Sequence, residues 1–141
     1  MTENEMLQEI HRGAQSAVFA MDALQDKIQG QQLQQTVALH RQEMQSIASR
    51  AESEISGRHL SAEDPSVWSK TGMWAGIQMN TMMDSSDSKI AEIMIQGSTM
   101  GVTNITREMN DSPALTPQTR RLGEELVAVS RHNIDRMKTY L

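Results

Sequence analysis

The chain contains no cysteine among its 141 residues. Disulfides, thiolate metal sites and cysteine nucleophiles are therefore excluded, and the absence suits a reducing cytoplasm. Only three prolines are present, which favours long uninterrupted helices. Aromatic residues make up 3% of the chain, too few to build the stacking platforms on which single-stranded nucleic acids bind.

Long apolar runs and an excess of positive charge are also lacking. No stretch approaches the roughly 18 apolar residues of a membrane span, and the polar start MTENEM does not resemble a secretion signal. The formal net charge of −5 argues against a general nucleic-acid binder, because phosphate backbones are negative too. We therefore expect a cytoplasmic protein with no membrane span and no nucleic-acid partner. Its length fits a single domain over residues 1–141.

Apolar and small residues recur along the chain at helical spacing. Alternating steps of three and four predict the buried faces of four long helices, and no run of period two predicts a strand. The four stripes are Leu7, Ile10, Ala14, Ala17, Met21, Leu24 and Ile28; Leu33, Val37, His40, Met44, Ile47, Ala51 and Ile55; Ile90, Met94, Gly97, Gly101 and Ile105; and Leu122, Leu126, Val129, Ile134, Met137 and Leu141.

Capping signals predict where the helices begin and end. Thr2 and Glu5 have the spacing of a capping box, which starts a first helix that runs to about residue 29. Gly30 and Gly57 are predicted to end the first two long helices, since glycine tolerates the left-handed conformation of a C-cap. The last helix is expected over 118–141, with Thr116 as its cap.

Two further helices are expected between these. A long helix over 89–109 follows the capping signal DSSDS (84–88). A shorter helix is expected over 65–84, with Ser61 or Asp64 as its cap, and it contains Trp68 and Trp74. The two tryptophans are six residues apart and so share no helical face; we expect this helix to cross the end of the others and cover part of their core.

This succession of elements resembles the ferritin-like up-down four-helix bundles, with an additional short helix between the second and third long helices. Within that superfamily the chain is most similar to the bacterial DUF2383-type proteins. The segment SKIAEIMIQGSTMGVTNIT (88–106) is similar to a stretch in Firmicutes proteins of this type, and NIDRMKTYL (133–141) resembles their closing helix. The resemblance implies an all-α, ferritin-like fold.

Di-iron members of this superfamily bind metal through inward-facing Glu residues and Glu-x-x-His motifs. The chain contains no Glu-x-x-His, and only one of six matched positions keeps its ligand type. The resemblance therefore implies no di-iron site here. The matched positions are Gln15, Glu43, Ser46, Ser98, Arg131 and Ile134.

His40 and Glu43 are the candidate metal ligands, because they are three residues apart and can share a helical face. Carboxylates such as Asp22 or Glu92 would have to complete such a site. We expect instead that no metal is bound, that His40 packs inward and hydrogen-bonds another helix, and that Glu43 is solvated. His11, His59 and His132 lie in polar surroundings and are expected to be exposed.

Gly97 and Gly101 form a G-x-x-x-G step that permits close contact between helices, within the chain or across a dimer. No catalytic constellation, phosphate loop or dinucleotide motif is present, so we expect a non-enzymatic protein without a cofactor that has a structural or partner-binding role. The expected partners are a second copy or another protein. Two alternatives are a metal-binding protein with displaced ligands and a carrier of a small apolar ligand held in a bundle cavity.

Overall fold

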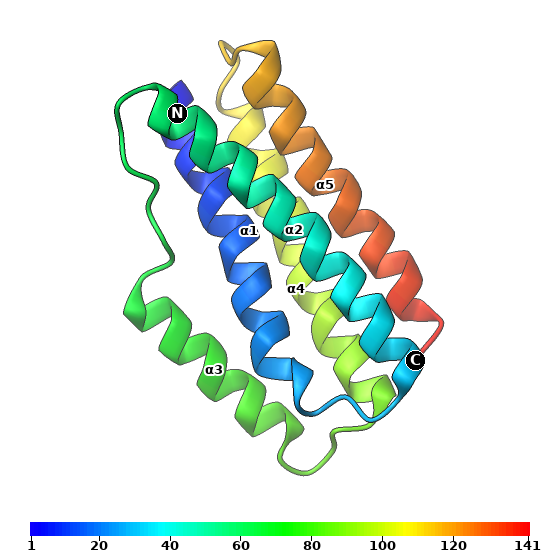
Figure 1. Cartoon of the computed structure of the whole chain (residues 1–141). Helices are drawn as coiled ribbons and strands as arrows, with labels where there is room; N and C mark the ends of the chain where they lie inside the picture. Colours follow the sequence, from blue (N-terminus) through cyan, green and yellow to red (C-terminus); the bar gives the residue numbers. More distant parts are fainter.

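The structure, a computed structural model, describes all 141 residues and contains five α-helices and no strand (Figure 1). The all-α prediction is therefore confirmed. The helices are α1 (Glu3–Gln25), α2 (Gln31–Gly57), α3 (Val67–Thr81), α4 (Asp87–Asn110) and α5 (Pro117–Lys138). None of them combines the length and the apolar character that crossing a lipid bilayer requires.

Side-chain caps start four of the five helices. Thr2 and Glu5 form the predicted capping box, in which each side chain accepts a hydrogen bond from the other residue's backbone N–H. Thr116 caps α5 as predicted, with Pro117 in the first turn. The cap of α3 is Ser66, which follows Pro65, rather than Ser61 or Asp64.

The two glycines predicted as left-handed C-caps have other roles. Gly30 has φ −76° and precedes α2, while α1 already ends at Gln25. Its N–H donates to Asp87 Oδ1 at 3.2 Å, and a Cβ at this position would clash with Asp87 Oδ2. A side chain here would therefore displace the Asp87 carboxylate from the Gly30 N–H. Gly57 is helical, and the left-handed residue of the next connection is His59, with φ 60°.

Contacts and short connections give the directions of the long helices. Residues 26–30 join α1 to α2, and residues 111–116 join α4 to α5, so each pair is antiparallel. Thr36 near the start of α2 hydrogen-bonds Tyr140 after the end of α5, whereas Arg50, later in α2, pairs with Glu125, earlier in α5. Since α5 opposes both α2 and α4, these two helices run the same way. This differs from a simple up-down succession.

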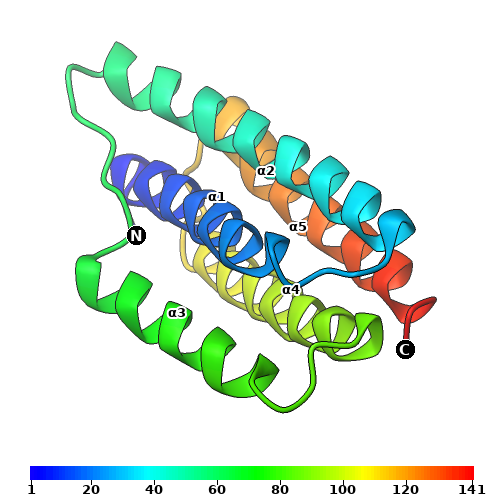
Figure 2. The same cartoon turned by 60° about the horizontal axis from the view of Figure 1, so that its bottom comes forward.

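The connection between α2 and α4 therefore returns along the length of the molecule, and α3 forms part of it (Figures 1 and 2). It lies along the side of α1 and α4 and does not cross the end of the helices as expected. Only Ile77 and Thr81 of α3 are buried, and Met73 is partly buried against the core. The helix therefore lies on the surface and contacts the core through one narrow face only.

The four long helices enclose one continuous core of aliphatic side chains and methionines. The predicted stripes of α1 and α2 are buried, except that Ala17 is only partly so. On α4 and α5 the prediction is wrong at several positions, because the buried residues keep steps of three and four that pass through polar side chains. Ser98, Ser130 and Asn133 are buried in place of their neighbours Gly97, Val129 and Ile134, and Leu141 is exposed.

Candidate functional site

His40 and Glu43, the candidate metal ligands, lie close together on α2. His40 Nδ1 is 3.8 Å from Glu43 Oε1 and has no hydrogen-bond partner, although the imidazole is buried. The carboxylate of Glu43 instead accepts a hydrogen bond from Arg136 Nη2 on α5 at 2.7 Å. Glu43 is therefore the partner of a cation, and it also stands beside a buried histidine.

Burial lowers the pKa of His40 to about 4, since a charged imidazole would lose its hydration inside the core. The negative charge of Glu43 opposes this shift, and the positive charge of Arg136 adds to it. His40 is consequently neutral at physiological pH.

A third ligand is missing beside this pair. Nowhere in the chain do three or more His, Asp or Glu side chains gather closely enough to hold a metal ion. Asp22, one of the carboxylates proposed to complete the site, pairs with Arg41 at 2.7 Å. Glu92, the other, is exposed and lies 3.6 Å from Lys89. The structure brings His40 and Glu43 together but surrounds Glu43 with a competing cation.

The G-x-x-x-G step is divided between two environments. Gly101 faces α5, where a Cβ would meet Ser130 Oγ at 3.6 Å and Leu126 Cδ2 at 4.0 Å, both ordinary contact distances. Gly97 is exposed, and a Cβ there would meet no atom within 4 Å. Gly101 thus contributes to a helix contact within the chain, whereas Gly97 makes none there.

A small polar cluster lies between α4 and α5 that the sequence patterns did not reveal. Asn133 Nδ2 donates to Ser98 Oγ at 3.0 Å, and both residues are buried. Asn133 Oδ1 and the hydroxyl of buried Ser130 have no partner. Ser130 and Asn133 are three residues apart on the inner face of α5, so the inward pair of this helix is one position before Arg131 and Ile134. Helical spacing could have predicted the burial of Ser130 and Asn133, since they follow Leu126 by steps of four and three.

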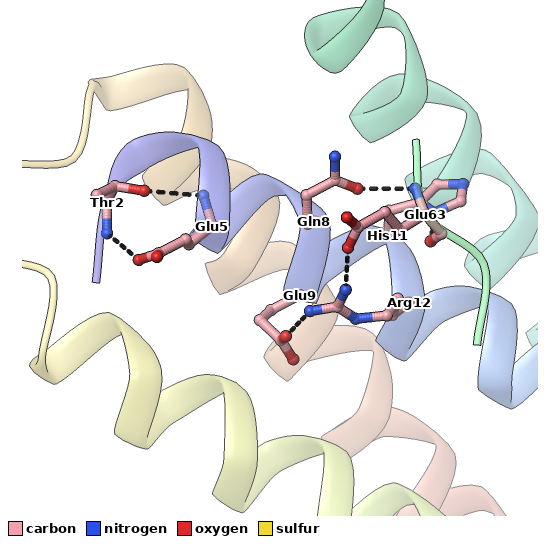
Figure 3. Close-up of polar contacts among 7 residues, drawn as sticks. All are labelled: Thr2, Glu5, Gln8, Glu9, His11, Arg12 and Glu63. Atoms are coloured by element: carbon pink, nitrogen blue, oxygen red, sulfur yellow. Dashed lines mark hydrogen bonds and ion pairs between the residues drawn. The ribbon is translucent and has the colours of Figure 1, made fainter. Parts of the chain in front are cut away.

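A second polar cluster fixes the chain before α3 to the first half of α1 (Figure 3). Gln8 Oε1 accepts from Glu63 N at 2.8 Å, and Gln8 Nε2 donates to the carbonyl of Ser61 at 3.0 Å. His11 Nδ1 donates to the carbonyl of Glu63 at 2.9 Å, and Arg12 bridges the carboxylates of Glu63 and Glu9. His11 is thus buried, contrary to expectation, because it holds this connection in place.

More than half of the exposed large apolar side chains lie in α3 and the two residues that follow it. Eleven large apolar residues are exposed in the chain, and six of them lie between Val67 and Met83. Trp68 is 87% exposed, Met79 73%, Met82 75% and Met83 92%. We use "the outer face of α3" for the residues opposite buried Ile77, namely Trp68, Gly72, Ala75, Met79, Met82 and Met83.

The sequence contained the elements of this face without revealing its exposure. Trp68, Gly72, Ala75, Met79 and Met82 follow steps of four, three, four and three, the spacing of a helix-pairing seam. Such a stripe is ordinarily buried within its own chain. In α3 the inner edge is formed instead by Met73, Ile77 and Thr81, so the seam faces solvent.

No protein family, curated protein or solved structure matches the chain.

Proposed function

We propose that this chain is a ferritin-like helical bundle without a di-iron site that acts as a protein-binding module and not as an enzyme, with the outer face of α3 as its binding surface. The four long helices, the single long return between α2 and α4, and the short helix in that return support the ferritin-like assignment. The absence of a di-iron site is supported by the polar residues buried between the long helices, His40, Ser98, Ser130 and Asn133, none of which is a carboxylate.

The observation that carries the proposal is the exposure of Trp68 and Met79 on α3 and of Met82 and Met83 directly after it. Contiguous exposed apolar patches mark interaction surfaces, because leaving them in water forgoes about 25 cal/mol per Å² of burial. Tryptophan is the residue type most often found at the energetic centre of protein interfaces. Methionine is flexible, so the surface can adapt to its partner.

The contacts that hold α3 against the rest of the chain also support a binding role. Hydrogen bonds that involve Gln8 and His11 fix the connection before it, and near its other end Ile77 and Thr81 are buried against the rest of the chain. A helix already held in place loses little conformational freedom on binding, which favours affinity.

The proposal is tested by isolating the tagged chain from the cells that naturally produce it. We expect a protein partner in near-stoichiometric amount with the wild type and its loss from the Met79→Lys variant. Thr103→Lys is the matched control, because Thr103 is exposed on α4 away from the apolar stretch. Both variants should retain the wild-type circular dichroism spectrum and melting temperature. Equal recovery of the same partner with Met79→Lys would contradict the proposal.

The metal-binding alternative depends on His40 and Glu43, and the ion pair between Glu43 and Arg136 weighs against it. Elemental analysis of protein purified without chelator separates the two classes. Iron, manganese or zinc in stoichiometric amount, lost in His40→Ala, would favour the alternative. A carrier of a small apolar ligand gains no support from the surface hollows beside Arg12 and beside Arg50, each of which is lined by one apolar residue and otherwise by polar ones.

A further inference from the structure

Two glycines in the middle of α3 have no role within the chain. A Cβ added at Gly72 or Gly76 would meet no atom within 4 Å, and neither residue has a positive φ. Glycine within a helix lowers its stability relative to alanine. The neighbouring outward residue Ala75 is small as well and only partly exposed. Nothing within the chain therefore requires small side chains at this point of the surface.

These small residues form the floor of a hole on the helix surface. When two helices pair, a side chain of one inserts between four residues of the other, at positions i, i+3, i+4 and i+7. Gly72, Ala75, Gly76 and Met79 occupy these four positions. Three of the four are small, so the hole is deep enough for a large side chain. Trp68 lies one turn before it and Met83 one turn after it, and both are exposed.

The hole lies in an uncharged segment that has an acidic residue beyond each end of the helix. From Thr71 to Met83 the chain carries no charged residue. Lys70 is two turns before buried Ile77, hence on the inner side of α3, and is half-buried. Beyond the two ends of the helix stand the exposed carboxylates of Asp64 and Asp84. Hydrogen bonds from Ser86 lower the pKa of Asp84, which keeps it ionised at neutral pH.

From these observations we infer that the outer face of α3 binds a helix of another protein that inserts a large aliphatic side chain between Gly72, Ala75, Gly76 and Met79 and carries Lys or Arg near both ends. This inference rests on the proposed function and names its partner. A second copy of the chain fits less well, since it would place acidic ends against acidic ends in either orientation. The phosphates of a lipid surface would face the same carboxylates.

The test uses the intact chain and three synthetic helical peptides. The first has an alanine-rich body, one central leucine and two lysines at each end. The second replaces the lysines by glutamates, and the third replaces the leucine by alanine. Binding is followed by fluorescence anisotropy of the labelled peptide at low salt. We expect the first peptide to bind at least tenfold more tightly than either control, and its affinity to fall as salt is added.

Variants of the chain separate binding from folding. Gly76→Ala should raise the melting temperature, because alanine favours the helix and its Cβ meets open space, yet weaken the first peptide about tenfold by filling the hole. Asp64→Asn combined with Asp84→Asn should remove the preference for lysine ends over glutamate ends and leave the leucine preference intact.

Several results would overturn the inference. They are equal binding of lysine-ended and glutamate-ended peptides, unchanged affinity in Gly76→Ala, and no binding at millimolar peptide. Sedimentation showing a dimer that dissociates in Met79→Lys would assign the face to a second copy. Co-sedimentation with phosphatidylcholine vesicles, abolished in the same variant, would assign it to lipid. If a cellular partner is lost from Met79→Lys while the peptides fail to discriminate, only the chemistry inferred for the partner is wrong.

Discussion

Ser98 and Ser130 lie on facing helices of the core, but their hydroxyls differ in what they bind. Ser98 Oγ accepts the hydrogen bond from Asn133, whereas Ser130 Oγ is buried without a partner. Ser98→Ala should therefore lower the free energy of unfolding by about 1–3 kcal/mol, because it leaves the buried Asn133 amide unpaired. Ser130→Ala should raise it by about 1 kcal/mol, since an unpaired hydroxyl is removed from the core. Urea unfolding of both variants, followed by circular dichroism, measures the difference. A loss of stability in Ser130→Ala would show that its hydroxyl is paired.

His40 gives the molecule a stability that depends on pH. The folded-state pKa of His40 is about 4, below its ordinary value of 6.5, so the unfolded chain takes up a proton first as the pH falls. Above pH 6.5 His40 is neutral in both the folded and the unfolded chain and does not affect the free energy of unfolding. As the pH falls from 6.5 toward 4, that free energy decreases. A shift of this size corresponds to about 3 kcal/mol.

The contribution of His40 can be isolated from that of the carboxylates by substitution. Between pH 7 and pH 4 the wild type should lose about 3 kcal/mol more unfolding free energy than His40→Gln, in which the titrating group is absent and Glu43 and Arg136 remain. Urea unfolding of the two proteins at a series of pH values provides the comparison. Parallel pH profiles would mean that His40 titrates alike in the folded and unfolded chain.

At the scale of whole elements, glycine has opposite effects in two places. Gly97 lies on the exposed side of α4 with open space around it, so Gly97→Ala should stabilise the fold by up to about 1 kcal/mol through helix propensity. Gly30→Ala should destabilise it by about 1–2 kcal/mol, because the new Cβ displaces the Asp87 carboxylate that accepts the Gly30 N–H. Thermal melting of both variants tests the pair. Stabilisation by Gly30→Ala would mean that the contact between the start of α4 and the turn before α2 has little energetic value.

The stripes of α1 and α2 could be predicted from sequence because nearly every inward position is apolar, from Leu7 to Ile55. The stripes of α4 and α5 could be predicted less well. Where a polar residue is buried beside an apolar neighbour, as with Asn133 and Ile134, hydropathy selects the neighbour and helical spacing selects the polar residue. The ion pair between Glu43 and Arg136 was also beyond the sequence, since Arg136 is far along the chain and reaches Glu43 only through the α2–α5 contact.

At the scale of the whole molecule, the position of α3 decides the functional account. Its apolar residues lie on two faces, and sequence alone does not show which face meets the core. The long return from α2 to α4 places α3 along α1, where Ile77 and Thr81 are sufficient to attach it. The remaining stripe, including Gly72, is then left on the surface, and Gly76 lies beside it. This exposed stripe is the reason why we propose a binding role for the bundle.

The central claim, that the outer face of α3 contacts another protein, is tested most directly by photo-cross-linking in the cells that naturally make the chain. A benzophenone amino acid is placed at Met79 or, as the matched control, at exposed Thr103 of α4. The account predicts a discrete cross-linked protein with the probe at position 79 and none at position 103. Absence of an adduct at position 79, or the same adduct at both positions, would contradict it.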